Sequence, residues 1–193
     1  MLKKLYWNFK DEIFRFNLHY SFLRRWPEPG GFWLRARAVS KRFESCGGNL
    51  TVNEGVRFRG IHRITAGKNL SIGVDAFIQA SGGLTLGDNV VLGPGVKIWT
   101  TNHKFEDPSV PIREQGLAYE PVAIGDDVWL GANVFIYPGV QLPEGCVVAA
   151  CSAVAKKRYP PYSILAGFPA RVIGNRQQAK PEPAADSSEV GVS

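Results

Sequence analysis

The chain has 193 residues and a hydrophobic fraction of 45%, which is enough for one globular domain with a sizeable core. Its net charge of +6 resides in residues 1–45, because the remaining residues carry 13 basic and 13 acidic side chains. Three cysteines, Cys46, Cys146 and Cys151, are odd in number and form no CxxC pair, which excludes a disulfide framework and favours a cytoplasmic protein. No apolar run is long enough to span a membrane, and we expect no secretion signal.

Residues 1–45 form a basic and aromatic segment whose apolar residues recur at helical spacing. This apolar line consists of Leu5, Phe9, Ile13, Phe16, Tyr20 and Leu23. Two interpretations remain open. The helix caps the open end of the repeats that follow or packs at a subunit interface, or it lies on the anionic inner face of the cytoplasmic membrane as a peripheral contact. Nucleic-acid binding is not expected, because no recognised RNA-binding motif is present.

Residues 46–174 repeat with a period of six. From Val122 the chain reads VAIGDD, VWLGAN, VFIYPG and VQLPEG, and further upstream it reads LSIGVD, LTLGDN, VVLGPG and VKIWTT. An apolar residue stands first and third in each unit, which predicts a short strand with these two positions facing inward. Gly, Asp, Asn and Pro at later positions predict a turn after each strand. Two units, VRFRGIHR and AFIQASGG, are two residues longer.

A strand of two or three residues cannot bury a core alone. Three such strands that form a triangular coil, stacked on the next coil at about 4.8 Å, would pair every strand with neighbours above and below. A β-sandwich is disfavoured, because its strands usually recur every 8–12 residues or so. We therefore predict an all-β solenoid over residues 46–174 with a protruding loop at about 100–121. The tail over 175–193, rich in Pro, Ala and Ser, is expected to be disordered.

The hexads, the histidine-bearing stretch TTNH and the closing segment PPYSILAGFPARVI occur in an order that resembles the hexapeptide-repeat acyltransferases. The resemblance covers about residues 64–174 and is strongest to sugar O-acetyltransferases of the galactoside, maltose and polysaccharide type. It implies a left-handed parallel β-helix, an exception to the usual right-handed crossover. It also implies acetyl-CoA as co-substrate and a homotrimer, in which each donor groove is completed by a neighbouring subunit.

The interruption at about 100–121 carries His103 near its start. Long loops of this kind are usually functional, and histidine suits removal of a hydroxyl proton near neutral pH. By itself His103 would more often be a solvated loop residue, but the resemblance assigns it as the general base. We assign no role to His19 or His62. A zinc site is disfavoured, because the three histidines are about forty residues apart and a catalytic zinc needs three neighbouring ligands.

The resemblance also implies how the donor is held. The backbone N–H of Ala132 would stabilise the oxyanion of the tetrahedral intermediate, beside Trp129. Further acetyl-CoA contacts would come from Ala150, Ala155, Lys156 and Arg171. Ala132 and Ala155 stand where the related enzymes have Ser and Thr, so two hydroxyl groups are missing here. Without the resemblance, Lys156 and the two basic residues after it would be read as a solvated turn.

For the acceptor, the resemblance points to Asp75 and Asn102, while Gly67 replaces an asparagine of the galactoside enzymes. Asp75 is also an ordinary residue for a hexad turn. The expected function is acetyl-CoA-dependent O-acetylation of a sugar, either free or as a lipid-linked glycan, in surface-polysaccharide synthesis. Two alternatives are an N-acetyltransferase of a nucleotide-linked amino sugar and a non-enzymatic β-solenoid scaffold.

Overall fold

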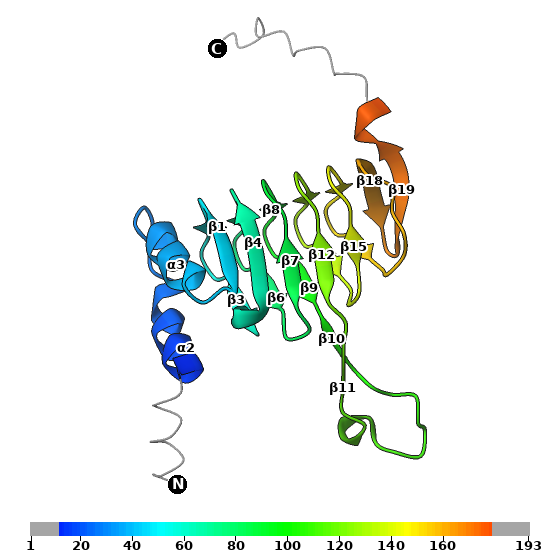
Figure 1. Cartoon of the computed structure of the whole chain (residues 1–193), viewed down its shortest axis with the longest axis horizontal. Coiled ribbons are helices and arrows are strands. Elements are labelled where there is room, and N and C mark those ends of the chain that lie inside the picture. The colour runs from blue at the N-terminus through cyan, green and yellow to red at the C-terminus, as the bar shows by residue number, and fades with distance from the viewer. Residues whose placement is uncertain (1–11, 179–193) are drawn as a thin grey trace, which may run out of the picture.

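The computed structural model describes residues 12–178 and shows a parallel β-helix with helices at its N-terminal end (Figure 1). Three parallel sheets form the faces of the coil, and a separate antiparallel hairpin leaves it. Sheet A contains β1 (Ser45–Gly48), β4 (Ile64–Lys68), β7 (Leu84–Leu86), β12 (Val122–Ile124) and β15 (Gln141–Leu142). Sheet B contains β2 (Thr51–Val52), β5 (Ser71–Ile72), β8 (Val91–Leu92), β13 (Trp129–Leu130), β16 (Val147–Val148), β18 (Ser163–Gly167) and β19 (Ala170–Asn175). Sheet C contains β3 (Arg57–Arg59), β6 (Phe77–Gln79), β9 (Lys97–Trp99), β14 (Phe135–Ile136) and β17 (Ala153–Val154).

The core consists of the inward hexad positions stacked in rows, as the repeat predicts. In sheet C, Ile78 pairs with Ile98, which pairs with Ile136, and all three are completely buried. A second row in sheet B contains Val52, Ile72, Leu92, Leu130, Val148 and Leu165. Because each row continues through the stack, the core is one column of branched side chains, and the predicted left-handed parallel β-helix is confirmed.

Polar residues fix the turn from sheet A to sheet B. Asn49, Asn69 and Asn89 occupy this turn in successive coils, all with positive φ, a conformation that asparagine tolerates better than most residues. Their side-chain amides form a ladder, in which each NH2 group donates to the carbonyl of the next at 2.7 Å. The polar residues of the hexads therefore adopt the backbone conformation of the turns and link successive turns by hydrogen bonds.

The coils are not all of one length. Ile64 pairs with Leu84, twenty residues later, whereas Phe135 pairs with Ala153, eighteen residues later. The additional residues of the early coils lie at the turns from sheet C to sheet A, which we call the loop corner (60–63, 80–83 and 100–121). This corner contains the 3-10 turn η1 (Ile61–Arg63) and the long insertion. The coils that follow the insertion are the shorter ones.

Two helices cover the first coil, α2 (Glu12–Leu23) and α3 (Gly31–Ser40), as Figure 1 shows. Phe16 and Tyr20 of α2 are buried, and the Tyr20 ring packs 5.9 Å from Phe58. The fully buried Arg35 of α3 donates from Nε to the Val52 carbonyl at 2.9 Å and forms an ion pair with Glu28. The described part of the N-terminal segment therefore caps the β-helix. Leu5 and Phe9 of the expected helical line lie outside the described residues.

At the other end, β19 pairs antiparallel with β18 and ends the parallel stack. The ordered chain continues past the expected boundary at residue 174 through η3 (Arg176–Gln178). Arg176 forms an ion pair with Asp127 at 2.9 Å, which fixes this extension to an earlier coil. The expected disorder of the tail falls mainly on 179–193, outside the described residues. In the described range, no helix has the length and apolar character needed to cross a membrane.

Candidate active site

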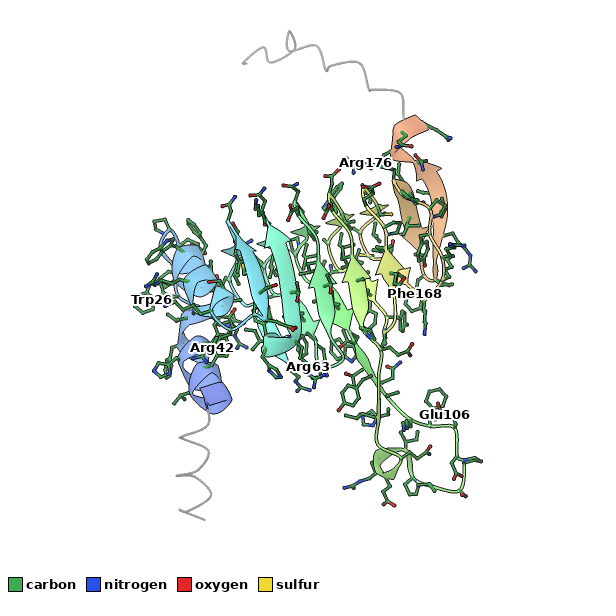
Figure 2. The ribbon with its side chains drawn as sticks, in the orientation of Figure 1. Trp26, Arg42, Arg63, Glu106, Phe168 and Arg176 are labelled. Carbon is green, nitrogen blue, oxygen red and sulfur yellow. The ribbon has the colours of Figure 1, made fainter. Side chains whose placement is uncertain are left out.

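The insertion forms a hairpin that projects from the loop corner (Figure 2). Its strands are β10 (Thr101–His103) and β11 (Leu117–Tyr119), in which His103 lies opposite Leu117. At its root, the buried Thr100 hydroxyl donates to the Gln79 carbonyl at 2.9 Å and accepts from the Gly82 N–H at 2.8 Å. This root fixes the start of the strand that carries His103. The His103 side chain itself is exposed, in a position where it can meet a substrate.

The far part of the insertion has its own polar contacts. The Gln115 amide donates to the carbonyls of Asp107 and Val110, both at 2.7 Å. The Asp107 carboxylate accepts hydrogen bonds from the Ser109 side chain and backbone, which lower the pKa of Asp107. The short 3-10 turn η2 (Ile112–Glu114) adds local structure. The long loop is therefore a folded arm.

A pocket of about 480 Å³ lies at the loop corner, between the root of the arm and the two longer repeats. His62, Arg63, Ser81 and Tyr119 line it. His62 is in the turn η1, as expected of a turn residue, but it faces this pocket. Sequence reasoning gave it no role. The sequence signal for this pocket is the additional length of the repeats VRFRGIHR and AFIQASGG, because residues at the ends of these two repeats line the pocket.

Lys156 is tied to the same corner. Its ammonium group forms an ion pair with Glu120, the residue that follows β11. The Lys156 side chain remains 65% exposed, so it can still reach a ligand. The neighbouring Ala155 is half-buried, and its carbonyl accepts a hydrogen bond from the Tyr159 hydroxyl at 2.8 Å. The root of the arm and this predicted donor contact therefore lie together.

The other predicted contacts occupy a different edge, the turns from sheet B to sheet C, which we call the alanine corner (73–76, 93–95, 131–133 and 149–152). Ala132 and Ala150 stack there, and the Ala132 carbonyl accepts from the Cys151 N–H at 2.8 Å. In the described part of the chain, the N–H groups of Ala132 and Ala150 donate to no protein acceptor. Two backbone donors are thus free at this corner, as an oxyanion site requires.

Asp75 also lies at the alanine corner, away from His103. It has a φ of 55°, and its carboxylate lies over Gly55. Asn133 occupies the same kind of position over Gly95, also with positive φ. The geometry of Asp75 is therefore accounted for by the turn. The other predicted acceptor residue, Asn102, is exposed beside His103.

The outer face of sheet C separates the two corners and carries a row of aromatic rings. Phe77 meets Trp99 edge to face at 4.9 Å, and Trp99 stacks on Phe135 at 5.9 Å. Phe135 in turn contacts Tyr137 at 4.8 Å. A single chain therefore presents His103 on one side of an aromatic face and the free Ala132 N–H on the other.

Trp129 and Arg171 both belong to sheet B, the sheet that leads into the alanine corner. Trp129 is on the outer face of sheet B, where its side chain is 53% exposed. Arg171 is exposed on β19, near Tyr159. Burial raises the pKa of the Tyr159 hydroxyl, and the positive charge of Arg171 opposes that rise. The structure thus brings Ala132 together with Ala150, and His103 with Asn102, but it does not gather all predicted residues in one chain.

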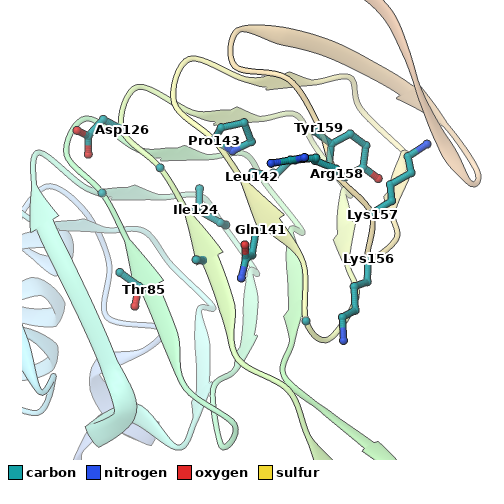
Figure 3. A pocket seen from close by; sticks show the side chains of 14 residues that line it. Thr85, Ile124, Asp126, Gln141, Leu142, Pro143, Lys156, Lys157, Arg158 and Tyr159 are labelled. Carbon is teal, nitrogen blue, oxygen red and sulfur yellow. The ribbon is translucent and has the colours of Figure 1, made fainter.

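A further pocket of about 840 Å³ forms a groove along sheet A (Figure 3). Its floor contains the small or polar outward residues Thr85, Ala123 and Gln141. The segment from Lys156 to Tyr159 forms its wall, because the chain passes from β17 to β18 without a further sheet A strand. Three cations and one acid, Asp126, line the groove, which suits an anionic ligand.

Among the described residues, no three His, Cys, Asp or Glu side chains come together as a metal-binding group.

Comparison with protein families gives a match to the hexapeptide repeat of succinyl-transferase over residues 63–98 and 121–155, on either side of the arm. The galactoside O-acetyltransferase of Escherichia coli is 34% identical over 140 residues, which cover 72% of this chain and 67% of that enzyme. A probable acetyltransferase of Mycobacterium tuberculosis is also 34% identical, but the matched 64% of this chain spans only 41% of it. A putative colanic acid biosynthesis acetyltransferase of E. coli is 28% identical over 69% of this chain and 70% of its own length.

Solved structures agree with these matches. A maltose O-acetyltransferase from Clostridium difficile superposes with a TM-score of 0.69 at 28% identity, covering 86% of this chain and 90% of that one. A hexapeptide-repeat acetyltransferase from Vibrio cholerae, solved with acetyl coenzyme A, gives a TM-score of 0.71 at 25% identity with the same coverage. Both relatives therefore share the overall fold of the present chain.

Proposed function

This chain belongs to the hexapeptide-repeat acyltransferases of the sugar O-acetyltransferase type, and from that premise we propose that it transfers an acetyl group from acetyl-CoA to a sugar hydroxyl with His103 as general base. The observation that carries the proposal is the ordered arm at the loop corner, which holds an exposed histidine beside the aromatic face of sheet C. A scaffold protein would have no need of this arm.

The reaction is a direct transfer. The imidazole of His103 takes the proton of the acceptor hydroxyl as its oxygen attacks the thioester carbonyl carbon. The negative charge on the thioester oxygen is stabilised by the Ala132 N–H. When the tetrahedral intermediate collapses, the carbon–sulfur bond breaks, and the imidazolium returns the proton to the thiolate of coenzyme A. The products are the O-acetyl sugar and free coenzyme A.

The donor would be held by small residues and cations. Ala150 and Ala155 let the pantetheine arm approach the coil, while Lys156 and Arg171 pair with its phosphates. Trp129 would flank the thioester end from sheet B. The solved Vibrio cholerae relative with acetyl coenzyme A supports this donor. Lys156 must share its charge between the ligand and Glu120, with which it pairs in the free chain.

The separation of the two corners supports a homotrimer. His103 of one subunit would meet Ala132 of a neighbour, since one chain places these groups on opposite sides of sheet C. Asp75, on the alanine corner, would then reach the acceptor bound by the neighbouring subunit's arm, whereas Asn102 would contact it beside the base. A closed ring of three subunits supplies three such sites.

The acceptor would be a sugar of a surface polysaccharide or its lipid-linked precursor. The similarity to a colanic acid biosynthesis acetyltransferase supports this assignment. N-acetylation of a nucleotide-linked amino sugar is the alternative. The product distinguishes O-acetylation from N-acetylation, because mild base removes the acetyl group from an O-acetyl ester but not from an N-acetyl amide.

The test is the variant His103→Ala in the full-length protein, with thiol release from acetyl-CoA as the measurement. Loss of the general base should lower turnover by roughly 10²–10⁴ while acetyl-CoA binding is unchanged. His19→Ala, on the exposed side of α2, is the matched control and should keep wild-type turnover. If His103→Ala retained wild-type turnover with an acceptor that the wild type acetylates, the assignment of His103 as the base would be wrong.

A further inference from the structure

Three arginines meet at the junction between the helical cap and the first coil. They belong to a pocket of about 320 Å³ on the outer face of sheet C, which we call the arginine pocket (Arg24, Arg57, Arg59 and Phe77). Arg24 comes from just after α2, whereas the other two arginines are both on β3. Because successive strand residues alternate between faces, Arg57 and Arg59 point outward together while Phe58 between them packs on the core.

The arginines are oriented before any ligand arrives. The guanidinium carbon of Arg57 lies 5.0 Å from the centre of the Phe77 ring, and that of Arg59 lies 5.7 Å from the same ring. Both cations are therefore held against the same aromatic ring. The Nε of Arg24 is buried and has no hydrogen-bond partner among the described residues. A buried donor without an acceptor is costly, so this group is poised for a ligand.

No acidic side chain lines the pocket in the described part of the chain. The carboxylate of Glu54 lies on the neighbouring turn, where it pairs with Arg25 at 3.5 Å. Three guanidinium groups around one small cavity repel one another unless an anion lies between them. Guanidinium groups pair with phosphate through two parallel hydrogen bonds, which makes a phosphate the best match to this arrangement.

The pocket also lies at a useful distance from the arm. Arg59 is opposite Gln79 on the next strand, and Gln79 is opposite Trp99 on the one after. Two strand spacings amount to about 10 Å. Trp99 ends β9, immediately before the residues that lead to His103, and its ring contacts Phe77 of the pocket. An aromatic surface of the size of a sugar ring therefore connects the arginines to the root of the arm.

We propose that the arginine pocket binds the phosphate of a phosphorylated acceptor sugar, a glycosyl phosphate or diphosphate, whose ring lies over Phe77 and Trp99 with a hydroxyl directed toward the arm. This inference rests on the proposed acetyl transfer and names its substrate class. A free sugar would leave the three arginines unused. An anionic lipid headgroup offers the same phosphate chemistry, and the experiment separates the two sources.

Calorimetric titration of inorganic pyrophosphate into the full-length protein tests the pocket directly. The protein is first saturated with acetyl-CoA, so that the donor site cannot take up the probe. Arg57→Gln and Arg59→Gln should each weaken pyrophosphate binding roughly tenfold, the usual effect of losing a charge-assisted hydrogen bond. Arg25→Gln is the matched control, because Arg25 is adjacent in sequence but pairs with Glu54 outside the pocket. It should leave the affinity unchanged.

A second measurement uses vesicles of equal parts phosphatidylcholine and phosphatidylglycerol. If Arg57→Gln and Arg59→Gln reduced only vesicle binding and left pyrophosphate binding unchanged, the pocket would belong to a lipid headgroup and the proposal would be overturned. Equal pyrophosphate binding by all variants, or none by the wild type, would overturn it as well. Because no readout here requires turnover, these results are independent of whether His103 is the base. Unchanged thermal unfolding of the variants controls for folding.

Discussion

The coils before the arm and the coils after it differ in length, and the difference lies at one corner. The early coils have twenty residues and a widened turn from sheet C to sheet A, while the late coils have eighteen and a tight turn. The inward rows are the same in both. Val122 pairs with Leu84 although the arm intervenes, so the insertion leaves the strand register intact. The repeat therefore keeps its core constant and varies only at its corners.

The two regions consequently offer different chemistry. The early coils carry the pocket at the loop corner, the arginine pocket and the root of the arm. The late coils carry free backbone N–H groups at the alanine corner and the cationic segment after β17. In the proposed reaction, the early coils would bind the acceptor and the late coils the donor. Two experiments test this division, and a third tests the helices that cap the first coil.

The variant Ala132→Pro tests the donor side and should have the largest effect. Proline removes the backbone N–H that would stabilise the oxyanion, which should lower turnover by roughly 10²–10³. The coil should tolerate it, because Pro94 occupies the equivalent turn position one coil earlier, also after a glycine. Ala132→Ser, which keeps the N–H, is the control. Full turnover of Ala132→Pro with an unchanged melting temperature would remove this residue from the mechanism.

A mixture of two inactive variants tests whether the corners meet across subunits. If His103→Ala and Ala132→Pro chains co-assemble as trimers, each mixed trimer contains one site with both groups intact. Random assembly should then restore roughly a quarter of wild-type turnover. The measurement is thiol release after co-expression, with the mass checked by light scattering. A mass of one chain, or no recovery by trimers of confirmed mixed composition, contradicts the shared site.

The smallest expected effect concerns vesicle binding by the cap, the helices α2 and α3. Phe22 and Trp33 are 74% and 59% exposed on the two helices, beside several cations of the basic segment. We expect Phe22→Ser and Trp33→Ser to reduce co-sedimentation with anionic vesicles several-fold, and salt to release the wild type by screening. Leu117→Ser, an exposed apolar residue of the arm, is the control. Absence of wild-type binding at low salt would leave the cap with its structural role alone.

These features differ in how far the sequence could predict them. The hexad alternation was sufficient for the coil and its core, because inward and outward positions depend only on period. The two longer repeats and the insertion were visible as breaks in that period. The exposed position of His103 on an arm follows from the same break. For the coil, its core and the arm, the local sequence pattern is therefore sufficient to predict the tertiary structure.

Other features depend on contacts between distant residues and carry no local signal. Arg35 reads as a surface cation of a basic segment, yet it is fully buried because carbonyls of the cap and first coil accept its hydrogen bonds. Arg176 falls in the expected tail, but Asp127, 49 residues earlier in the chain, fixes it. In each case the partner is not adjacent in sequence.

The cap also has a consequence for solubility. Backbone groups in the stack pair alternately with the coil before and the coil after, so those of the first coil that face away from the second coil have no coil to pair with. Such an edge is a template for strand addition and end-to-end fibre growth. Arg35 and the Tyr20 hydroxyl close it by donating to the carbonyls of Val52 and Val56. The cap therefore occupies the edge at which a further coil or a second molecule would otherwise pair.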